Sequence, residues 1–200
     1  MDRVNGIKKL TDNRFLNLYE LSASFRDGSS APYYVVSRRR DVDKLKAVTH
    51  DNHPDGVILY GIHGENKDKV VLIRQYRYPI DGYVYEFPAG LVEPGEDMLE
   101  GGIREMHEET GLAFSPIAAT EPYFMSVGMT DESCGIIFGY CSGDPTNSNQ
   151  EGTEDIQVIL ADRAECRRIL KEERVALPCA YMLMHFVASE ADPLHFLSAL

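Results

Sequence analysis

A short acidic stretch in the middle of the chain holds the residues best suited to chemistry. Residues 90–112 read GLVEPGEDMLEGGIREMHEETGL and contain seven carboxylates but only one arginine. On a helix, Glu105, Glu108 and Glu109 stand at positions i, i+3 and i+4, so their side chains share one face. Carboxylate oxygens gathered in this way are the ligands that Mg²⁺ or Mn²⁺ prefers. The stretch therefore predicts a divalent-cation site, and its alternative is a solvated acidic face.

A solvated face leaves unexplained the glycines at both ends of the stretch and the isolated Arg104. The segment resembles the Nudix box, which is a Gly, five residues, a Glu, seven residues, then Arg-Glu-apolar-x-Glu-Glu-x-Gly-apolar. Every required position is filled, by Gly90, Glu96, Arg104, Glu105, Met106, Glu108, Glu109, Gly111 and Leu112. At ordinary residue frequencies, such a match arises by chance in fewer than about one chain in a million. Gly101 and Gly102 stand where the family usually has small helix formers such as alanine. Each glycine destabilises the helix by about 0.5–1 kcal/mol relative to alanine.

The resemblance continues on both sides of the box, where the sequence is similar to the ADP-ribose pyrophosphatase branch of the family. The segments that carry it are VVLIRQYRYPI and YEFPAG before the box, and SVGMTDE and EDIQV after it. It implies an α+β fold, a Nudix α/β/α sandwich with a mixed sheet, preceded by a small N-terminal antiparallel β domain. We expect residues 1–54 to form this strand and dimerisation domain and residues 55–200 to form the catalytic domain. The branch also implies a homodimer.

The family's metal ligands can be carried over position by position. Glu105 and Glu109 match ligands of Mg²⁺ or Mn²⁺, the carbonyl of Ala89 matches the backbone ligand, and Glu154 matches a further carboxylate from the loop before the last strand. Glu108 lies close by as ligand or orienter. The structural positions of the box are Gly90, Glu96, Arg104 and Gly111, with Glu96 and Arg104 expected to form an ion pair.

The same comparison assigns the proton acceptor and the substrate-binding residues. Glu151 is the expected base of the reaction, with Glu108 as the alternative. Arg38, Arg77 and Glu132 match substrate-binding positions, although Arg38 also begins a run of three arginines that can be a plain solvated run.

The resemblance implies a metal-dependent hydrolase of a nucleoside diphosphate linked to another group. The expected substrate is a nucleotide sugar, first of all ADP-ribose, cleaved to AMP and ribose 5-phosphate. Val127 stands where the ADP-ribose branch has a proline, so other nucleotide sugars such as ADP-glucose and GDP-mannose remain alternatives. A Nudix domain that senses such ligands without catalysis is the alternative from another class, and the intact box disfavours it.

Composition limits the other function classes. The formal net charge of −12 disfavours a nucleic-acid partner, which would need a basic surface. No apolar run approaches the roughly 18 residues of a membrane span, and no secretory signal begins the chain, so we expect no membrane partner and a cytoplasmic location. The four cysteines show no metal-binding spacing and are expected to be buried, reduced thiols.

Local patterns predict the elements that position these residues. An Asp27-Gly28 turn joins two strands, 15–21 and 31–37, and a polar linker covers 38–56. A helix follows in the box, a second begins at Asp162 through a capping box, and a third over 179–189 buries Met182, Met184 and Phe186. Further strands are expected at 56–62, 69–76, 82–87, 134–141 and 155–161.

Overall fold

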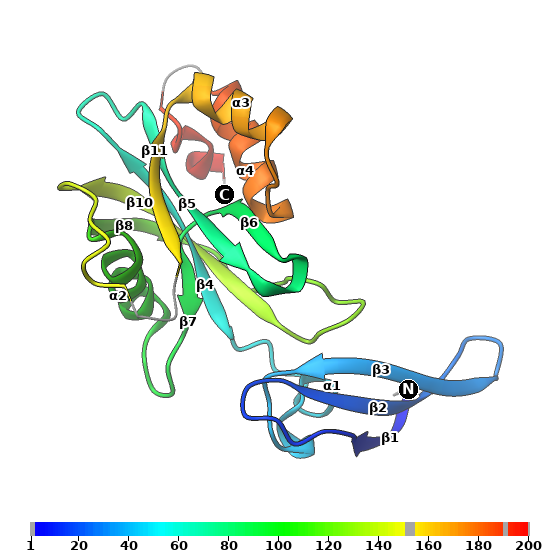
Figure 1. The fold of residues 1–200 in the computed structure, drawn as a ribbon. Coiled ribbons are helices and arrows are strands. Elements are labelled where there is room, and N and C mark those ends of the chain that lie inside the picture. Colours follow the sequence, from blue (N-terminus) through cyan, green and yellow to red (C-terminus); the bar gives the residue numbers. More distant parts are fainter. Residues whose placement is uncertain (1–2, 151–154, 190–191, 200) are drawn as a thin grey trace. The chain divides into compact units, whose positions relative to one another are not determined.

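The computed structural model describes residues 3–150, 155–189 and 192–199 (Figure 1). These residues fall into two compact units. The smaller unit comprises those within Met1–Asp55 and Pro122–Cys134, and the larger one comprises those within Gly56–Glu121 and Gly135–Leu200. The segment 122–134 thus groups with the N-terminal strands, although it lies far from them in the sequence.

The smaller unit is built on a three-stranded antiparallel sheet of order β1-β2-β3. Its strands are β1 (Val4–Lys9), β2 (Asn17–Ser24) and β3 (Ser30–Ser37). The turn between β2 and β3 contains Gly28 at a φ of 87°, and the Asp27 carboxylate accepts a hydrogen bond of 3.0 Å from the Ser29 N–H. The predicted hairpin is confirmed, and β1 adds a third strand to it.

The predicted linker over 38–56 is wrong in part. It contains a 3₁₀ turn, η1 (Val42–Lys44), and a short helix, α1 (Lys46–Thr49), and the side chains of Leu45 and Lys46 are buried. Lys46 meets Ser133 of the segment 122–134. A polar composition cannot reveal such a contact, because its partner lies almost ninety residues away in the chain.

The larger unit is organised by a mixed sheet whose main path runs β11-β5-β4-β10-β8. Strand β6 pairs with β5, and β7 pairs with β4. The short β9 (Tyr123–Phe124) pairs with Ser133 and Cys134 at the start of β10, and these four residues belong to the smaller unit. The other strands are β4 (Gly56–His63), β5 (Lys69–Arg77), β6 (Gly82–Glu86), β7 (Ala89–Leu91), β8 (Ala113–Ala119), β10 (Ser133–Ser142) and β11 (Ile156–Ala161). The strands expected from apolar patterns are all present, and β7, β8 and β9 are additional.

Helices cover both faces of this sheet, which confirms the predicted α/β/α sandwich (Figure 1). Helix α2 (Met98–Thr110) places Met106 in a buried cluster with Val57 and Leu59 of β4. Tyr60, which points to the opposite face of β4, packs against Phe87 and Phe138 on the side of helices α3 (Arg163–Glu172) and α4 (Leu177–Ala188). The chain also has short 3₁₀ turns at η2 (Tyr78–Ile80) and η3 (His195–Ala199).

Gly102 allows α2 to lie close to the sheet. A Cβ at this position would lie 2.4 Å from Cδ1 of Ile137 and 3.0 Å from Cδ2 of Leu59. The loss of helix propensity at this glycine is therefore offset by packing that a side chain would obstruct.

The ends of the helices follow local signals. Asp97 caps α2 by accepting from Leu99 N–H at 2.8 Å, and Gly111 ends it at a φ of 74°. Asp162 caps α3 as predicted, accepting from Glu165 N–H at 2.8 Å.

The core assignments of the two methionines on α4 are wrong. Met182 is only half-buried and Met184 is 54% exposed, whereas Leu183 is buried together with the predicted Phe186, so the apolar face of the helix is rotated from the expected one. All four cysteines are free, three of them buried and Cys134 half-buried. None of the helices in the described ranges is long and apolar enough to span a membrane.

Candidate functional site

Arg104 stands at the centre of the acidic stretch. Its Nε and Nη2 donate to the two carboxylate oxygens of Glu96 at 2.9 and 3.0 Å. Its Nη1 donates to Glu105 at 2.8 Å and to Glu108 at 2.9 Å. Its Nη2 also donates to the carbonyl of Leu91 in β7 at 3.1 Å. One guanidinium thus joins three carboxylates of the box to the strand in front of the helix.

These contacts keep the pair of Arg104 and Glu96 charged. The hydrogen bonds from Arg104, helped by the N–H of Glu93, lower the pKa of Glu96 to about 2. Glu96 in turn raises the pKa of Arg104 above its ordinary value. The expected ion pair is present, and it fastens the loop before α2 to the middle of the helix.

Glu109 is held differently, against the backbone of β7. Glu109 is only 4% exposed, and its Oε2 accepts a hydrogen bond from the N–H of Ala89 at 3.0 Å. A Cβ on the neighbouring Gly90 would lie 1.9 Å from the carboxylate carbon of Glu105. The backbone of residues 89–90 therefore packs directly on the carboxylates of α2, and a side chain at position 90 would displace the carboxylate of Glu105.

The donor atoms gathered here fit a hard divalent cation. Carboxylates of Glu105, Glu108 and Glu109 and the backbone at Ala89 offer only oxygen ligands beside a glycine that contributes no side chain. In the ranges that the structure describes, no three His, Cys, Asp or Glu residues are arranged as a ready cation site. The carboxylates of Glu105 and Glu108 both bind Nη1 of Arg104.

The loop before β11 is attached to the last turn of α2. Thr146 N–H donates to the carbonyl of Thr110 at 2.9 Å, Asn149 Nδ2 donates to that of His107 at 3.3 Å, and Gln150 Nε2 donates to that of Glu109 at 2.8 Å. The bonds to Thr110 and Glu109 satisfy carbonyls at the end of the helix that have no partner within it, whereas the carbonyl of His107 also accepts from the N–H of Gly111 at 2.8 Å. Sequence reasoning did not single out the three loop residues, and only their polar character next to the expected base hinted at them. Glu151 and Glu154 lie outside the described residues.

The predicted substrate-binding residues form two separate ion pairs. In the smaller unit, Arg38 Nε donates to Glu132 Oε1 at 2.8 Å, so two residues 94 positions apart are brought together. In the larger unit, Arg77 Nε donates to Glu86 Oε2 at 2.6 Å. Glu86 was not predicted as a site residue. It pairs with Ile73 across the β5–β6 hairpin, and because side chains alternate between the faces of a strand, it lies on the same face as Arg77.

Val127 occupies an exposed turn of the smaller unit. The carbonyl of Ser126 accepts from the N–H of Met129 at 2.9 Å, so Val127 is the second residue of a four-residue turn, and it is 69% exposed. Tyr33 and Val36 of β3 bind this turn through the carbonyls of Gly128 and Met129, at 2.7 and 2.8 Å. Position 127 therefore lies at the tip of a loop that β3 supports.

Comparison with known proteins places the acidic stretch in a wider context. Residues 52–177 match the model of the NUDIX domain. The chain is 34% identical over 117 residues to putative nudix hydrolase 2 of Caenorhabditis elegans, covering 55% of this chain and 52% of that protein. It is 32% identical over 127 residues to the methanol dehydrogenase activator of Bacillus methanolicus, covering 62% and 66%. It is 34% identical over 135 residues to the ADP-ribose pyrophosphatase of Saccharomyces cerevisiae, covering 66% and 54%.

These alignments span about half to two thirds of the relatives' own lengths. A solved structure described as an ADP compounds hydrolase shares the fold, with a TM-score of 0.63 at 16% identity, over 84% of this chain and 82% of that one. The family model covers more than half of the chain and includes the whole box and the β7 backbone packed on it. The chain belongs to the Nudix family.

Proposed function

We propose that this protein is a Nudix pyrophosphatase that hydrolyses the diphosphate of a nucleoside diphosphate linked to another group. The preferred substrate is ADP-ribose, cleaved to AMP and ribose 5-phosphate. The observation that carries the proposal is the packing of Glu105 and Glu109 of α2 against the backbone at 89–90. The names of the yeast relative and of the solved structure support an ADP-containing substrate.

The proposed cofactor is Mg²⁺ or Mn²⁺, held by Glu105, Glu109, Glu154 and the carbonyl of Ala89. When bound, such an ion stabilises charge on the phosphoryl oxygens and acidifies a water molecule. The residues of the chain prepare this chemistry, because Arg104 orients Glu105 and Glu108 while Ala89 orients Glu109.

The remaining roles concern the proton and the substrate. A carboxylate oxygen of Glu151 accepts the proton of the attacking water, and Glu108 is the alternative acceptor. Arg38, Arg77 and Glu132 bind the substrate through charge-assisted hydrogen bonds. Each arginine already has a carboxylate partner, so a phosphate or hydroxyl of the substrate joins or replaces an existing ion pair.

The substrate range is proposed to be broader than ADP-ribose alone. Val127 keeps a backbone N–H and a freer φ than proline would at the tip of its exposed turn. ADP-glucose and GDP-mannose are therefore the alternative substrates.

A second function, action on a partner enzyme through a sensed ligand, is favoured by one observation. The chain is similar to a protein named methanol dehydrogenase activator over 62% of its length. The complete set of box carboxylates, each held in place, supports hydrolysis as the first function.

We also propose that the protein is a homodimer formed through the N-terminal domain. A three-stranded sheet buries little apolar surface alone, and Phe15, Tyr33 and Tyr34 of this domain are exposed. Light scattering should give twice the 22.5 kDa of one chain, and a 22.5 kDa particle at micromolar concentration would refute the dimer. The four free thiols favour a reducing compartment, for which we propose the cytoplasm.

A panel of nucleotide sugars tests the proposed function. The protein is incubated with ADP-ribose, ADP-glucose or GDP-mannose and Mg²⁺, and the products are separated by ion-exchange chromatography. We expect AMP and ribose 5-phosphate from ADP-ribose, and no product after EDTA treatment. Hydrolysis of another nucleotide sugar without hydrolysis of ADP-ribose would refute the substrate, and no hydrolysis of any would refute the activity.

A further inference from the structure

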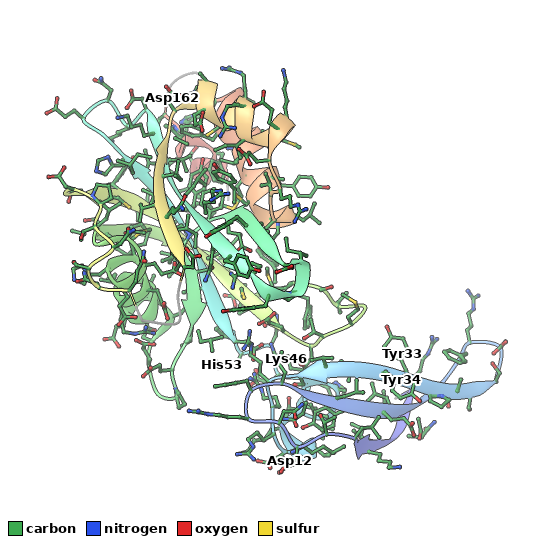
Figure 2. The ribbon with its side chains drawn as sticks, in the orientation of Figure 1. Asp12, Tyr33, Tyr34, Lys46, His53 and Asp162 are labelled. Atoms are coloured by element: carbon green, nitrogen blue, oxygen red, sulfur yellow. The ribbon has the colours of Figure 1, made fainter. Side chains whose placement is uncertain are left out.

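A cluster of buried charges lies in the smaller unit. Lys46 and Asp55 are only 7% and 9% exposed, and Lys46 Nζ lies 2.8 Å from Asp55 Oδ2 (Figure 2 labels Lys46). Lys46 Nζ also donates to Ser133 Oγ, and Arg39 Nη1 pairs with Asp55 Oδ1. Both oxygens of the Asp55 carboxylate are therefore bound by cations.

The backbone joins the same cluster. Asp55 N–H donates to the carbonyl of Ser133 at 2.8 Å, and Ser133 N–H donates to Asp55 Oδ2 at 3.0 Å. The hydroxyl of Ser133 reaches the carbonyl of His53 at 3.5 Å. The neighbouring segments 39–46 and 53–55 are thus tied to Ser133, which lies 78 positions beyond Asp55 in the sequence.

Burying such a cluster has a desolvation cost that apolar contacts between loops would not have. Removing two charges from water carries a large desolvation penalty that their attraction must offset, and apolar side chains of similar volume often stabilise a fold as well or better. Unlike apolar packing, charge-assisted hydrogen bonds impose direction as well as proximity. A role in setting geometry accounts for the buried charges better than a role in stability.

The residues next to the cluster are the proposed substrate-binding pair. Ser133 directly follows Glu132, and Arg39 directly follows Arg38. Asp55 therefore binds the neighbours of both members of the 2.8 Å pair between Arg38 and Glu132. Asp55 thus contacts both chain segments from which this pair projects.

We propose that Lys46 and Asp55 are positioning residues that set the geometry of the Arg38–Glu132 pair for substrate recognition. The inference rests on the proposed function, which assigns substrate binding to that pair. Lys46 acts through Asp55 and Ser133, and Asp55 acts through Arg39 and Ser133.

Kinetics of Lys46→Met, compared with Lys44→Met, provide the first test. Lys44 is exposed and pairs with Asp41 at 3.1 Å, so its substitution makes the same charge change without touching the cluster. We expect Lys46→Met to raise the KM for ADP-ribose about tenfold or more while kcat changes less than about twofold, as for a lost binding interaction. Lys44→Met should leave both constants at the wild-type values, and Lys46→Arg should recover part of the lost KM.

A spectroscopic test needs no substrate. The Nε–H of Arg38 donates to Glu132, so its ¹H–¹⁵N NMR signal reports the geometry of the pair, and Arg38→Lys identifies the signal by removing it. We expect this signal to shift in Lys46→Met and to stay in place in Lys44→Met. Where Lys46→Met does not fold by circular dichroism, Ser133→Ala serves instead, because it removes only the hydroxyl that Lys46 binds.

The outcomes separate the inference from the function on which it rests. A folded Lys46→Met or Ser133→Ala with lowered thermal stability but unchanged KM and unchanged Arg38 signal would overturn the positioning role and leave a structural one. If the wild type hydrolyses no nucleotide sugar, the proposed function fails. The NMR comparison then still decides whether the cluster sets the geometry of Arg38 and Glu132.

Discussion

Arg104 binds Glu96 through two nearly equal hydrogen bonds, from Nε at 2.9 Å and from Nη2 at 3.0 Å. The two residues are eight positions apart, on α2 and on the loop before it. The planar fork of a guanidinium suits this two-point contact, which a lysine ammonium cannot reproduce. The same side chain still has Nη1 free to hold Glu105 and Glu108, so the pair with Glu96 orients the carboxylates of the proposed metal site.

The pair makes stability depend on pH in the acid range. The folded pKa of Glu96 is about 2 against an ordinary value of 4.5, so its contribution is complete above about pH 4.5 and is lost as the pH falls through about 2. We therefore expect Glu96→Gln to be less stable than wild type at pH 6. The difference should shrink below pH 4.5 and be lost as the pH falls below about 2. Urea unfolding at a series of pH values measures it, and a difference that does not change with pH would contradict the role of this carboxylate.

Substitution of Gly102 tests the close packing of α2 on the sheet. Gly102→Ala gains up to about 1 kcal/mol of helix propensity, but the new Cβ would overlap Ile137 and press on Leu59. Overpacking of this kind typically costs about 1–3 kcal/mol, so we expect a net loss of about 1–2 kcal/mol. Urea unfolding monitored by circular dichroism gives the value. A variant more stable than wild type would show that α2 does not need the glycine.

Proline at position 127 should sharpen substrate choice. Val127 is the second residue of its turn, a position that proline favours. We expect Val127→Pro to keep the fold, to gain about 0.4–1 kcal/mol of stability, and to increase the preference for ADP-ribose over ADP-glucose and GDP-mannose. Ratios of kcat/KM for the three substrates measure this preference. Equal ratios of kcat/KM in wild type and Val127→Pro would show that position 127 does not determine substrate specificity.

The two loop carboxylates should separate by kinetics. Glu151→Gln removes the proposed proton acceptor, so kcat should fall by about 10²–10⁴-fold with little change in substrate binding. Glu154→Gln removes a proposed ligand, so the Mg²⁺ concentration at half-maximal rate should rise instead. Rates at varied Mg²⁺ and ADP-ribose distinguish the two effects. If Glu151→Gln behaves as wild type, the base is Glu108 or Glu154.

Local patterns predicted much of the fold and of the acidic helix. The apolar runs of β4, β5, β10 and β11 carry their own signal, because a buried strand needs an unbroken apolar sequence. The cap at Asp162 and the common face of Glu105 and Glu109 depend on residues within one or two helical turns. Such local features can be predicted from the sequence because both interacting residues lie within a few positions of each other.

Features that depend on distant partners were missed. The segment 38–56 reads as a polar linker because of its polar composition and its terminal Pro54 and Gly56. The burial of Lys46 within it involves Asp55 and also Ser133, which is 87 residues away from Lys46. Helix α4 is apolar on most sides, so its sequence does not say whether Leu183 or Met184 faces the core. The tie of Gln150 to the carbonyl of Glu109 joins a loop and a helix end, which no local spacing encodes.

The carboxylates of the box are proposed to form a catalytic metal site, and turnover of Glu109→Gln tests this role most directly. An amide can still accept from Ala89 N–H, so the fold should survive while one charge of the site is lost. Glu100→Gln, an exposed change on the same helix, is the matched control. We predict that Glu109→Gln lowers kcat on ADP-ribose at ordinary Mg²⁺ by about 10²–10³-fold, with Glu100→Gln at the wild-type rate. A folded Glu109→Gln that turns over at nearly the wild-type rate would contradict the metal site.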